Sequence, residues 1–474
     1  MKSPILGSSY IARSGQAAAN RMVNLYPEIV NEGGKSRACL FRAPGLRLLA
    51  TVGGGPIRGC WTFGGMGYVV SGSKLYSVSR QWESEELGTV SGGTGLVSMA
   101  DNGTQLFIAC RPRAFVYNAF AGIFAEITDP DFVGAVTVGY LDGYFLFNEP
   151  GTQTIWITQL FDGTAVDGLD FASAEGFPDD LVAVFVDHRE AWLFGAISTE
   201  VWYNSGASDF PIERVQGAMI EVGAASPDCI AKIDNTIMWL GHDGIVYRAN
   251  GYTPQRKSTH ALETWITDNA DISEAQAYSY RQDGHQWYVL TFPNTDTTWV
   301  YDVATDAWHE RASWDDGLFI RHRSNCHMFF NGEHVVGDFE NGNLYALDPS
   351  VYSDNGAVQK WLRAWRALPP GTDALKYKTH HSLQLDVETG RTTLQTGQGS
   401  VPEVMLRFSD DAGNRWSHEL WRQMGAIGRT ERRVIWRRLG LSSKLRDRIY
   451  EVSGTDPIRI VITGAELDMG AADA

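Results

Sequence analysis

The stretch NTIMWLGHDGIVYRANG, residues 235–251, has the pattern of a single β-hairpin. An apolar run comes first, and a second run follows in which side chains alternate between apolar and polar, as in GIVYRA. The Asp243-Gly244 pair between the runs supplies the positive φ angles that a two-residue hairpin turn requires. Helical periodicity is almost absent, so the stretch predicts two strands joined by a tight turn.

The same unit recurs between about residues 60 and 350, each time as an apolar strand, a tight turn and a second strand that carries aromatic residues. The spacing is about 40–50 residues, which is typical of four-stranded propeller blades. The seven members are 66–79, 104–122, 143–158, 190–206, 235–251, 285–308 and 332–350.

Seven hairpins also fit a stack of sandwiches or two smaller sheets, and the repeat does not separate seven blades from six. We favour a closed, propeller-like array because radial closure protects edge strands that this apolar, aromatic set would otherwise expose. The chain is therefore predicted to be all-β, a class that its 16 Trp and 50 Gly also favour.

Three regions are predicted. Residues 1–55 are an N-terminal arm with few strand signals, residues 56–350 hold the repeats, and residues 351–474 form a C-terminal β-sandwich-like domain. At its start, Trp361 and Trp365 fit one face of a helix and equally one face of a strand. Further strands are expected at 381–387, 403–409, 432–440, 448–453 and 458–467.

The charge is acidic and unevenly distributed. A net charge of −16 and a pI near 5.1 argue against a protein that grips nucleic acid through Lys and Arg contacts. Residues 351–474 hold 18 Lys and Arg against 15 Asp and Glu, or +3, which leaves 22 against 41, or −19, for residues 1–350. The C-terminal region is therefore expected to have different neighbours.

The cysteines are scattered, odd in number and without a C-x-x-C pair, which predicts reduced, mostly buried thiols. No apolar run reaches the length of a signal peptide or a membrane span. We therefore expect a protein that is made and kept soluble in a cytoplasm, without a membrane partner. The five cysteines are Cys39, Cys60, Cys110, Cys229 and Cys326.

The sequence RFSDDAGNRW, residues 407–416, contains the S-x-D-x-G-x-x-W pattern of the Asp-box hairpins on sialidase propellers. Ser409 and Asp411 are predicted to hydrogen-bond turn amides. Gly413 is predicted to take an open backbone angle, and Trp416 to pack beneath the hairpin. None of these roles is catalytic and the repeats hold no second copy, so we interpret the motif as structural.

No residue is assigned to catalysis, to a cofactor or to a metal. The pairs Asp179-Asp180 and Asp315-Asp316 could act as acid and base across a glycosidic bond. Adjacent strand residues point to opposite faces, however, and such pairs in loops are usually solvated. The histidines lack the accompanying spacing of a zinc site. We therefore predict a protein that is not an enzyme.

The segment GRTERRVIWRRLG, residues 428–440, has the most unusual local composition. As a strand it leaves a basic, aromatic surface, and Trp and Arg are enriched at interface hot spots. We predict a docking surface for another subunit or an acidic ring, with a solvated basic face as the alternative. The candidate interface residues are Arg432, Arg433, Trp436, Arg437 and Arg438.

With these segments located, the chain resembles the packaged-DNA-stabilisation family of short-tailed bacteriophages, the tail-hub, nozzle or head-completion proteins. The resemblance begins in RSGQAAANRMVNLYPEIVNEGGKSRACLFRAPGL (13–46), where VNLYPE is followed by a strand ending in F-x-x-P-G-L. It continues in SLQLDVETG (382–390), in the hairpin at 407–416 and in RRVIWRRLGLSSKLRDRIYEVSGTDPIRIVITGAELDM (432–469). Length and order agree over nearly the whole chain.

The resemblance implies a virion tail component that is assembled in the host cytoplasm. It implies a homo-oligomeric ring, expected to be a hexamer, below the portal–adaptor ring, with a tail needle or tip and a tailspike or fibre as further partners. Such a ring closes the channel after packaging and conducts double-stranded DNA on ejection without sequence-specific binding. No catalytic residue, metal or cofactor comes with the family.

Two other readings stay open at this point. One is a carbohydrate-binding or carbohydrate-cleaving propeller, a lectin or glycosidase of phage or prophage origin. The other is a bacterial scaffold propeller encoded by a prophage.

Overall fold

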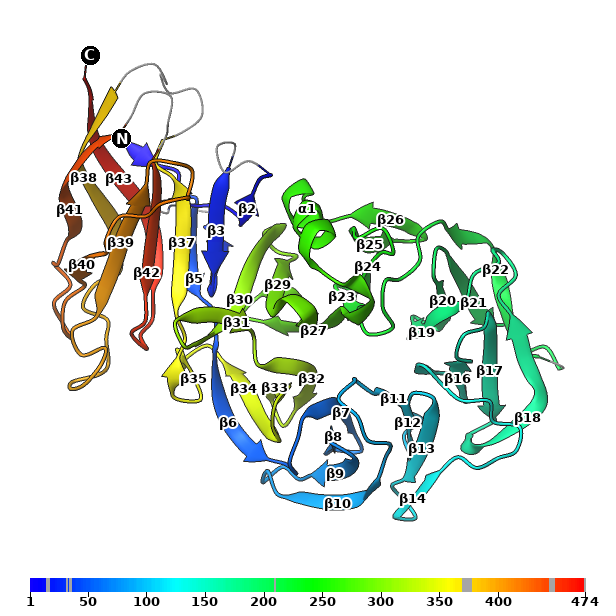
Figure 1. Cartoon of the computed structure of the whole chain (residues 1–474). Coiled ribbons are helices and arrows are strands. Elements are labelled where there is room, and N and C mark those ends of the chain that lie inside the picture. The colour runs from blue at the N-terminus through cyan, green and yellow to red at the C-terminus, as the bar shows by residue number, and fades with distance from the viewer. Residues whose placement is uncertain are drawn as a thin grey trace.

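Figure 1 shows a wheel of small sheets beside a sandwich of longer strands. The structure is a computed structural model that describes residues 1–13, 18–30, 33, 36–208, 210–368, 377–442 and 448–472. Some residues of two predicted segments lie outside the described residues. They are 14–17, 31, 32, 34 and 35 in the predicted arm, and 443–447 in the C-terminal segment that resembles the phage family.

The wheel contains seven four-stranded blades within the described chain, and each is built from antiparallel neighbours. Five blades are separate sheets. The first comprises β7 (Ile57–Phe63), β8 (Met66–Ser71), β9 (Lys74–Val78) and β10 (Ser84–Thr89). The second comprises β11 (Ser98–Asp101), β12 (Gln105–Cys110), β13 (Arg113–Asn118) and β14 (Ile123–Glu126). The third comprises β15 (Val138–Leu141), β16 (Tyr144–Asn148), β17 (Thr154–Gln159) and β18 (Asp162–Ser173).

The remaining two separate sheets and the short helices follow. The fourth blade comprises β19 (Leu181–Asp187), β20 (Glu190–Gly195), β21 (Thr199–Asn204) and β22 (Ile212–Ile220). The fifth comprises β23 (Ala231–Ile233), β24 (Thr236–Leu240), β25 (Val246–Asn250) and β26 (Thr253–Arg256). Helix α1 (His260–Asn269), capped by Thr259, and the 3-10 turn η1 (Ile272–Glu274) lead to the sixth blade, which contains the turn η2 (Pro293–Thr295).

The last two blades belong to larger sheets. The sixth comprises β27 (Gln276–Gln282), β28 (His285–Phe292), β29 (Thr297–Asp302) and β30 (Ala307–Asp315), with β31 (Leu318–Arg321) beside β30. The seventh comprises β32 (Ser324–Phe330), β33 (Glu333–Asp338), β34 (Asn343–Asp348) and, as its outermost strand, β6 (Gly45–Thr51). The N-terminal region therefore closes the propeller by antiparallel pairing with β34.

The first strand of each blade faces the centre of the wheel. Together β7, β11, β15, β19, β23, β27 and β32 contribute residues that line a central cavity of about 600 Å³. Because β7 also contacts β32, the first and seventh blades are neighbours and the circle is closed.

The C-terminal sandwich packs two sheets over one core, and short strands beside β6 link it to the propeller. One sheet runs β4 (Leu25–Ile29), β5 (Ala38–Arg42), β43 (Val461–Ala472), β38 (Tyr377–Val387) and β41 (Val434–Ser442), with β1 (Lys2–Ser3) beside β43. The other runs β3 (Ala19–Val23), β37 (Trp361–Arg366), β42 (Ile449–Gly454), β39 (Glu403–Ser409) and β40 (Leu420–Gln423), with β2 (Tyr10–Ile11) beside β3. The linking strands are β35 (Ser353–Asp354) and β36 (Ala357–Val358).

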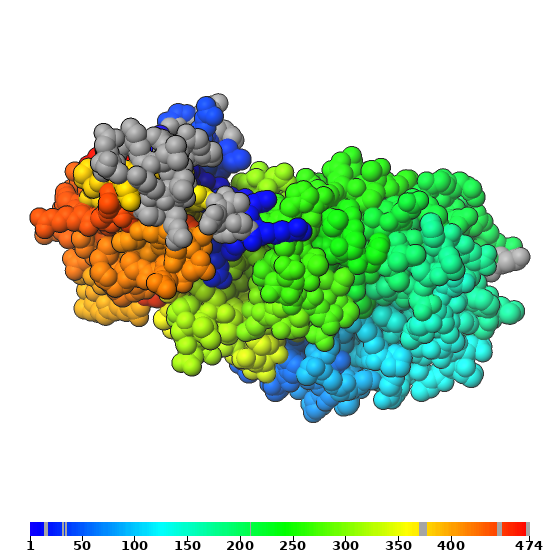
Figure 2. All heavy atoms as spheres, turned by 45° about the horizontal axis from the view of Figure 1, so that its top comes forward, coloured from blue at the N-terminus to red at the C-terminus, as the bar shows by residue number. Residues whose placement is uncertain are grey.

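Strand β3 joins the two parts into one sheet. It meets β30 of the sixth blade at Val23 and pairs antiparallel with β37 of the sandwich. Arg21 holds the carboxylate of Glu310 with two nitrogens, at 3.0 and 2.8 Å. Figure 2 shows N-terminal residues, in blue, at the boundary between the sandwich and the propeller.

Asn24, directly after β3, is a second tie between the parts. Its side-chain amide donates to the carbonyls of Ala312 and Lys360, both at 2.7 Å, and its oxygen accepts from Ala312 N at 3.0 Å. The residue is buried and has a φ of +53°, a conformation that Asn tolerates better than most residues.

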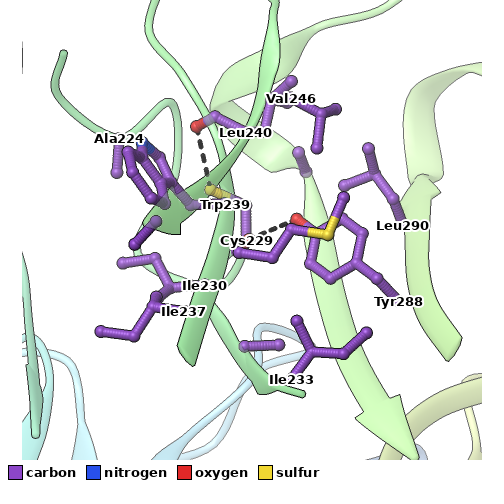
Figure 3. Packing of buried hydrophobic residues seen from close by; sticks show 14 of the residues in the cluster. Ala224, Cys229, Ile230, Ile233, Ile237, Trp239, Leu240, Val246, Tyr288 and Leu290 are labelled. Carbon is purple, nitrogen blue, oxygen red and sulfur yellow. Dashed lines mark hydrogen bonds between the residues drawn. The ribbon is translucent and has the colours of Figure 1, made fainter. Parts of the chain in front are cut away.

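Apolar side chains fill the contacts between neighbouring blades. Between the fifth and sixth blades, the Cys229 thiol donates to Leu240 O at 3.4 Å and the Tyr288 hydroxyl donates to Cys229 O at 2.6 Å (Figure 3). Burial raises the pKa of Cys229 to about 11. All five cysteines are unpaired thiols, and only Cys326 is more than slightly exposed.

The predicted fold class is confirmed: the chain is all-β, with a propeller array and a C-terminal sandwich. The expected strand-poor arm is wrong, because residues 1–55 hold β1 to β6. β2 pairs with β3, and β4 with β5, but the other partners of these strands lie in β30, β34, β37 and β43, hundreds of residues away. The arm therefore carries little local signal of its place in the fold.

The ties made by Asn24 predict a large effect of a small change. Asn24→Gly keeps the positive φ but removes the side-chain partner of two buried backbone groups and one half-buried group, so we expect the free energy of unfolding to fall by about 2–4 kcal/mol. The control is Asn331→Gly, because Asn331 has a φ of +52° in an exposed turn. Urea unfolding should show a change below about 0.5 kcal/mol for the control. Equal effects would contradict the assignment.

Buried histidines predict acid sensitivity. Burial lowers the pKa of His309 well below its usual value and lowers the pKa of His322 to about 3. Between about pH 3 and pH 6.5, both are neutral in the folded chain but gain a proton when the chain unfolds. The stability that they contribute is therefore complete above about pH 6.5 and is lost as the pH falls toward 3. Each should contribute a slope of up to about 1.4 kcal/mol per pH unit. His309→Phe should reduce this slope in urea unfolding, whereas the exposed His418→Gln should not.

Candidate functional site

The hairpin after β39 positions its polar residues around one turn. Ser409 Oγ accepts from Gly413 N at 2.9 Å and donates to Asp411 Oδ1 at 2.8 Å, and the same carboxylate oxygen accepts from Arg415 N at 2.8 Å. Gly413 has a φ of +92°, which favours glycine. Trp416 is half-buried, with the Arg407 guanidinium 4.6 Å from its ring centre. All these contacts hold the turn itself.

An ion pair anchors this hairpin to the sandwich. Arg448 Nε and Nη2 each lie 2.7 Å from an oxygen of Asp410, and Nη1 donates to Leu439 O at 2.6 Å. The guanidinium stacks 4.0 Å from the centre of the Phe408 ring. Because Arg448 is fully buried, Asp410 neutralises a charge that would otherwise be costly to bury.

The predicted arginine cluster lies on the edge strand β41 and on the turn before it. Arg432, Arg433, Arg437 and Arg438 are all exposed, and within the described residues none forms an ion pair with a carboxylate. Arg433 does hydrogen-bond the side-chain oxygen of Gln384 at 3.0 Å. In Figure 1, β41 and β40 lie on the side of the sandwich farthest from the propeller.

The prediction that Trp436 contributes to an exposed surface is wrong. Its indole is fully buried in the sandwich core and donates to Leu420 O at 2.7 Å. A β-bulge also changes the neighbouring faces: Arg438, with a φ of +59°, and Leu439 lie opposite the single residue His381. The bulge turns Arg438 outward, away from the buried face that Trp436 occupies.

Two exposed residues that the sequence analysis missed lie beside the cluster on β40. Trp421 is 48% exposed, and Arg422 Nε donates to Ile435 O of β41 at 2.9 Å. Alternation of side chains along LWRQ, residues 420–423, could have indicated that Trp421 points outward. A strand of this length is too short to show a clear alternation of apolar and polar residues. We call the exposed side chains of this region the basic edge: Trp421, Arg422, Arg432, Arg433, Arg437 and Arg438.

The central cavity of the propeller is poorly suited to acid–base catalysis. Among the described residues that line it, the carboxylates are Asp101 and Asp228. Asp101 accepts from Trp61 Nε1 at 2.7 Å, and Asp228 pairs with two nitrogens of Arg111, one of them at 2.7 Å. Each carboxylate is thus held by a neighbour rather than directed at a shared substrate position.

The other candidate carboxylates lie in turns. Asp179 accepts from the backbone of Ile197 and from the backbone and hydroxyl of Ser198, which fixes a loop. Asp315 and Asp316 are exposed at the β30–β31 turn, where Asp316 has a φ of +44°. Within the described residues, no group of three or more His, Cys, Asp or Glu side chains could hold a metal, and no helix is long and apolar enough to cross a membrane.

Comparison with family models decides the class of protein. Residues 1–352 match the model described as bacteriophage P22 Gp10, beta-propeller, and residues 361–470 match bacteriophage P22 Gp10, beta-sandwich. The chain belongs to the bacteriophage P22 Gp10 family. The suspected family is thereby confirmed, and so is the class of function: a member of the Gp10 family is a structural tail-hub protein of a phage that stabilises packaged DNA.

Other comparisons add little to the Gp10 assignment. A search of curated proteins gives no match. Among solved structures, streptogramin B lyase is 11% identical, with 69% of this chain and 98% of that chain covered and a TM-score of 0.42. The extracellular domain of a putative hybrid two-component system from B. thetaiotaomicron is 12% identical, with 81% and 48% covered and a TM-score of 0.45. Neither likeness bears on what the Gp10-family chain does.

The Asp410–Arg448 pair predicts that the hairpin contributes to stability. In Asp410→Asn, a charged acceptor becomes a neutral amide beside a buried guanidinium, so we expect the free energy of unfolding to fall by about 1–2 kcal/mol. The control is Glu431→Gln, which removes an exposed ion pair with Arg429 at 3.8 Å and should cause no measurable change. Urea titration of both variants checks this; an unchanged Asp410→Asn protein would refute it.

Proposed function

We propose that this Gp10-family chain forms a homo-oligomeric ring, expected to be a hexamer, that docks below the portal–adaptor ring through its basic edge. The ring closes the channel after packaging and conducts double-stranded DNA on ejection. A tail needle or tip and a tailspike or fibre are its further partners in the virion tail, and the ring is assembled in the host cytoplasm.

The basic edge carries this proposal. Its arginines are exposed and have no carboxylate partners among the described residues, although the chain as a whole has a net charge of −16. Unpaired arginines next to an exposed Trp are typical of hot spots on a docking surface. An acidic ring offers the complementary charge, which speeds encounter and selects orientation.

The propeller supports a conduit between subunits. Its central cavity of about 600 Å³ has the size of a small-molecule pocket and cannot admit a DNA duplex. DNA must therefore pass through the lumen of the ring and not through the wheel of any one subunit. Residues 1–350 carry 41 acidic against 22 basic residues, so such a lumen would repel the duplex and let it slide without sequence-specific binding.

We also propose a non-enzymatic role, which the same features support. The carboxylates that line the cavity are paired, and the Asp-box-like hairpin of Ser409, Asp411, Gly413 and Trp416 stabilises a turn. We expect no hydrolysis of purified host capsule or lipopolysaccharide.

Charge reversal of the basic edge tests the docking proposal. A variant that combines Arg432→Glu, Arg433→Glu and Arg437→Glu should bind purified portal–adaptor complexes at least tenfold more weakly than the wild type. The affinity of the wild type should fall as the salt concentration rises. Arg438 is left unchanged because it has a positive φ, so that a substitution there would change folding as well as binding. Negative-stain images should show the wild-type chain as an added ring at the portal vertex.

The matched control reverses three exposed arginines of the propeller that have no positive φ, Arg80, Arg113 and Arg281. It changes the net charge by the same amount, so weakened binding of the test variant alone assigns the effect to the basic edge. Equal binding of wild type and both variants would overturn the docking surface.

A further inference from the structure

Two cysteines meet where the propeller closes. Cys60 lies on β7 of the first blade and Cys326 on β32 of the seventh, and the Cys326 thiol donates to Cys60 Sγ at 3.3 Å. They are 266 residues apart in sequence, and both line the central cavity. No other pair of cysteines in the chain has such a contact between described side chains.

The seam around this pair is tightly fixed. The side chain of Asn325, next to Cys326, donates to Ile57 O at 2.8 Å and so ties β32 to β7. Gly337 on the neighbouring strand leaves just enough room: a Cβ there would lie 2.3 Å from Ile57 and 3.2 Å from Cys326 Sγ. The two sulfurs are therefore held together by packing rather than brought close by a mobile loop.

We propose that Cys60 and Cys326 form a disulfide that locks the first blade to the seventh, with a small-molecule disulfide such as oxidised glutathione as the oxidant. The sulfurs need to approach by about 1.3 Å to reach the bonded distance of roughly 2.05 Å. We infer that rotation of the two side chains about Cα–Cβ supplies this movement.

The bond forms in two exchange steps. The thiolate of Cys326, which is the more exposed of the two, attacks one sulfur of oxidised glutathione, breaks its S–S bond and releases one glutathione thiolate. The sulfur of Cys60 then attacks Cys326 Sγ and releases the second glutathione. Two protein thiols are oxidised, one glutathione disulfide is reduced to two thiols, and the two protons pass to the released thiolates or to water.

Cys60 is suited to the second step rather than the first. Its hydrogen bond with Cys326 and its burial raise its pKa well above the usual value, so Cys60 is the poorer nucleophile toward the oxidant and the first exchange falls to Cys326. Because Cys60 is buried beside Cys326, it reacts with the Cys326–glutathione disulfide before a second glutathione can reach that sulfur.

The disulfide would add a covalent link to a wheel that is otherwise closed by strand pairing within the seventh blade. The seventh blade is completed by the pairing of β6 with β34, and the chain then continues directly into the first blade. A bond between Cys60 and Cys326 closes a loop that contains most of the first blade and the whole of the second to sixth blades, and so constrains the unfolded chain strongly. On the proposed function, the subunit would assemble with thiols in the cytoplasm and be locked after the virion leaves the cell.

Oxidation of the full-length chain tests the site. After incubation with oxidised glutathione, free thiols should fall from five to three, the mass should fall by about 2 Da, and non-reducing peptide mapping should find Cys60 linked to Cys326. The midpoint of thermal unfolding should rise by several degrees relative to the reduced protein.

Cys326→Ser should fold like the reduced wild type and show no oxidant-dependent shift, whereas Cys110→Ser should retain the full shift. Glutathione that remains attached to Cys326, or a linked pair without a stability change, would overturn the proposal. These outcomes are independent of ring assembly, because they are measured on the isolated chain. Mapping of purified virions then tests the timing separately.

Discussion

The fold depends on a short N-terminal strand that pairs on both sides. β3 meets β30 of the propeller and β37 of the sandwich, so one continuous sheet crosses from one part to the other. β6, which follows β4 and β5 in the same N-terminal region, completes the seventh blade. The first fifty residues thus close the wheel and fix its position against the sandwich. Hydrogen-bonded backbone therefore connects the propeller to the sandwich.

Local patterns in the sequence predicted the repeated part of the fold well. Each blade consists of neighbouring strands, and two-residue turns such as Asp142-Gly143, with a positive φ at both residues, join them. At Asp243-Gly244 the predicted two-residue turn is wrong, because only Gly244 has a positive φ and residues 241–245 join β24 to β25. The arm was not predicted because β3 and β6 have partners about 290 to 340 residues away, which no local pattern records. Trp361 and Trp365 left helix and strand equally open; they lie on strand β37, where packing in the sandwich core decides the conformation.

The candidate site was predicted in composition but not in detail. The exposed arginines of β41 follow from the sequence, but the burial of Trp436 does not, because alternation alone does not say which face meets the opposite sheet. The bulge at Arg438 depends on pairing with β38. Trp421 and the Cys60–Cys326 contact are juxtapositions of distant segments and become visible only in three dimensions.

We propose that this chain is a rigid ring subunit whose basic edge faces the adaptor. A cryo-EM map of the virion tail tests it most directly. We predict a ring of identical copies below the portal–adaptor assembly, with each sandwich oriented so that β40 and β41 contact an acidic surface of the adaptor. Density for the chain in the capsid shell or in a peripheral fibre would contradict the account.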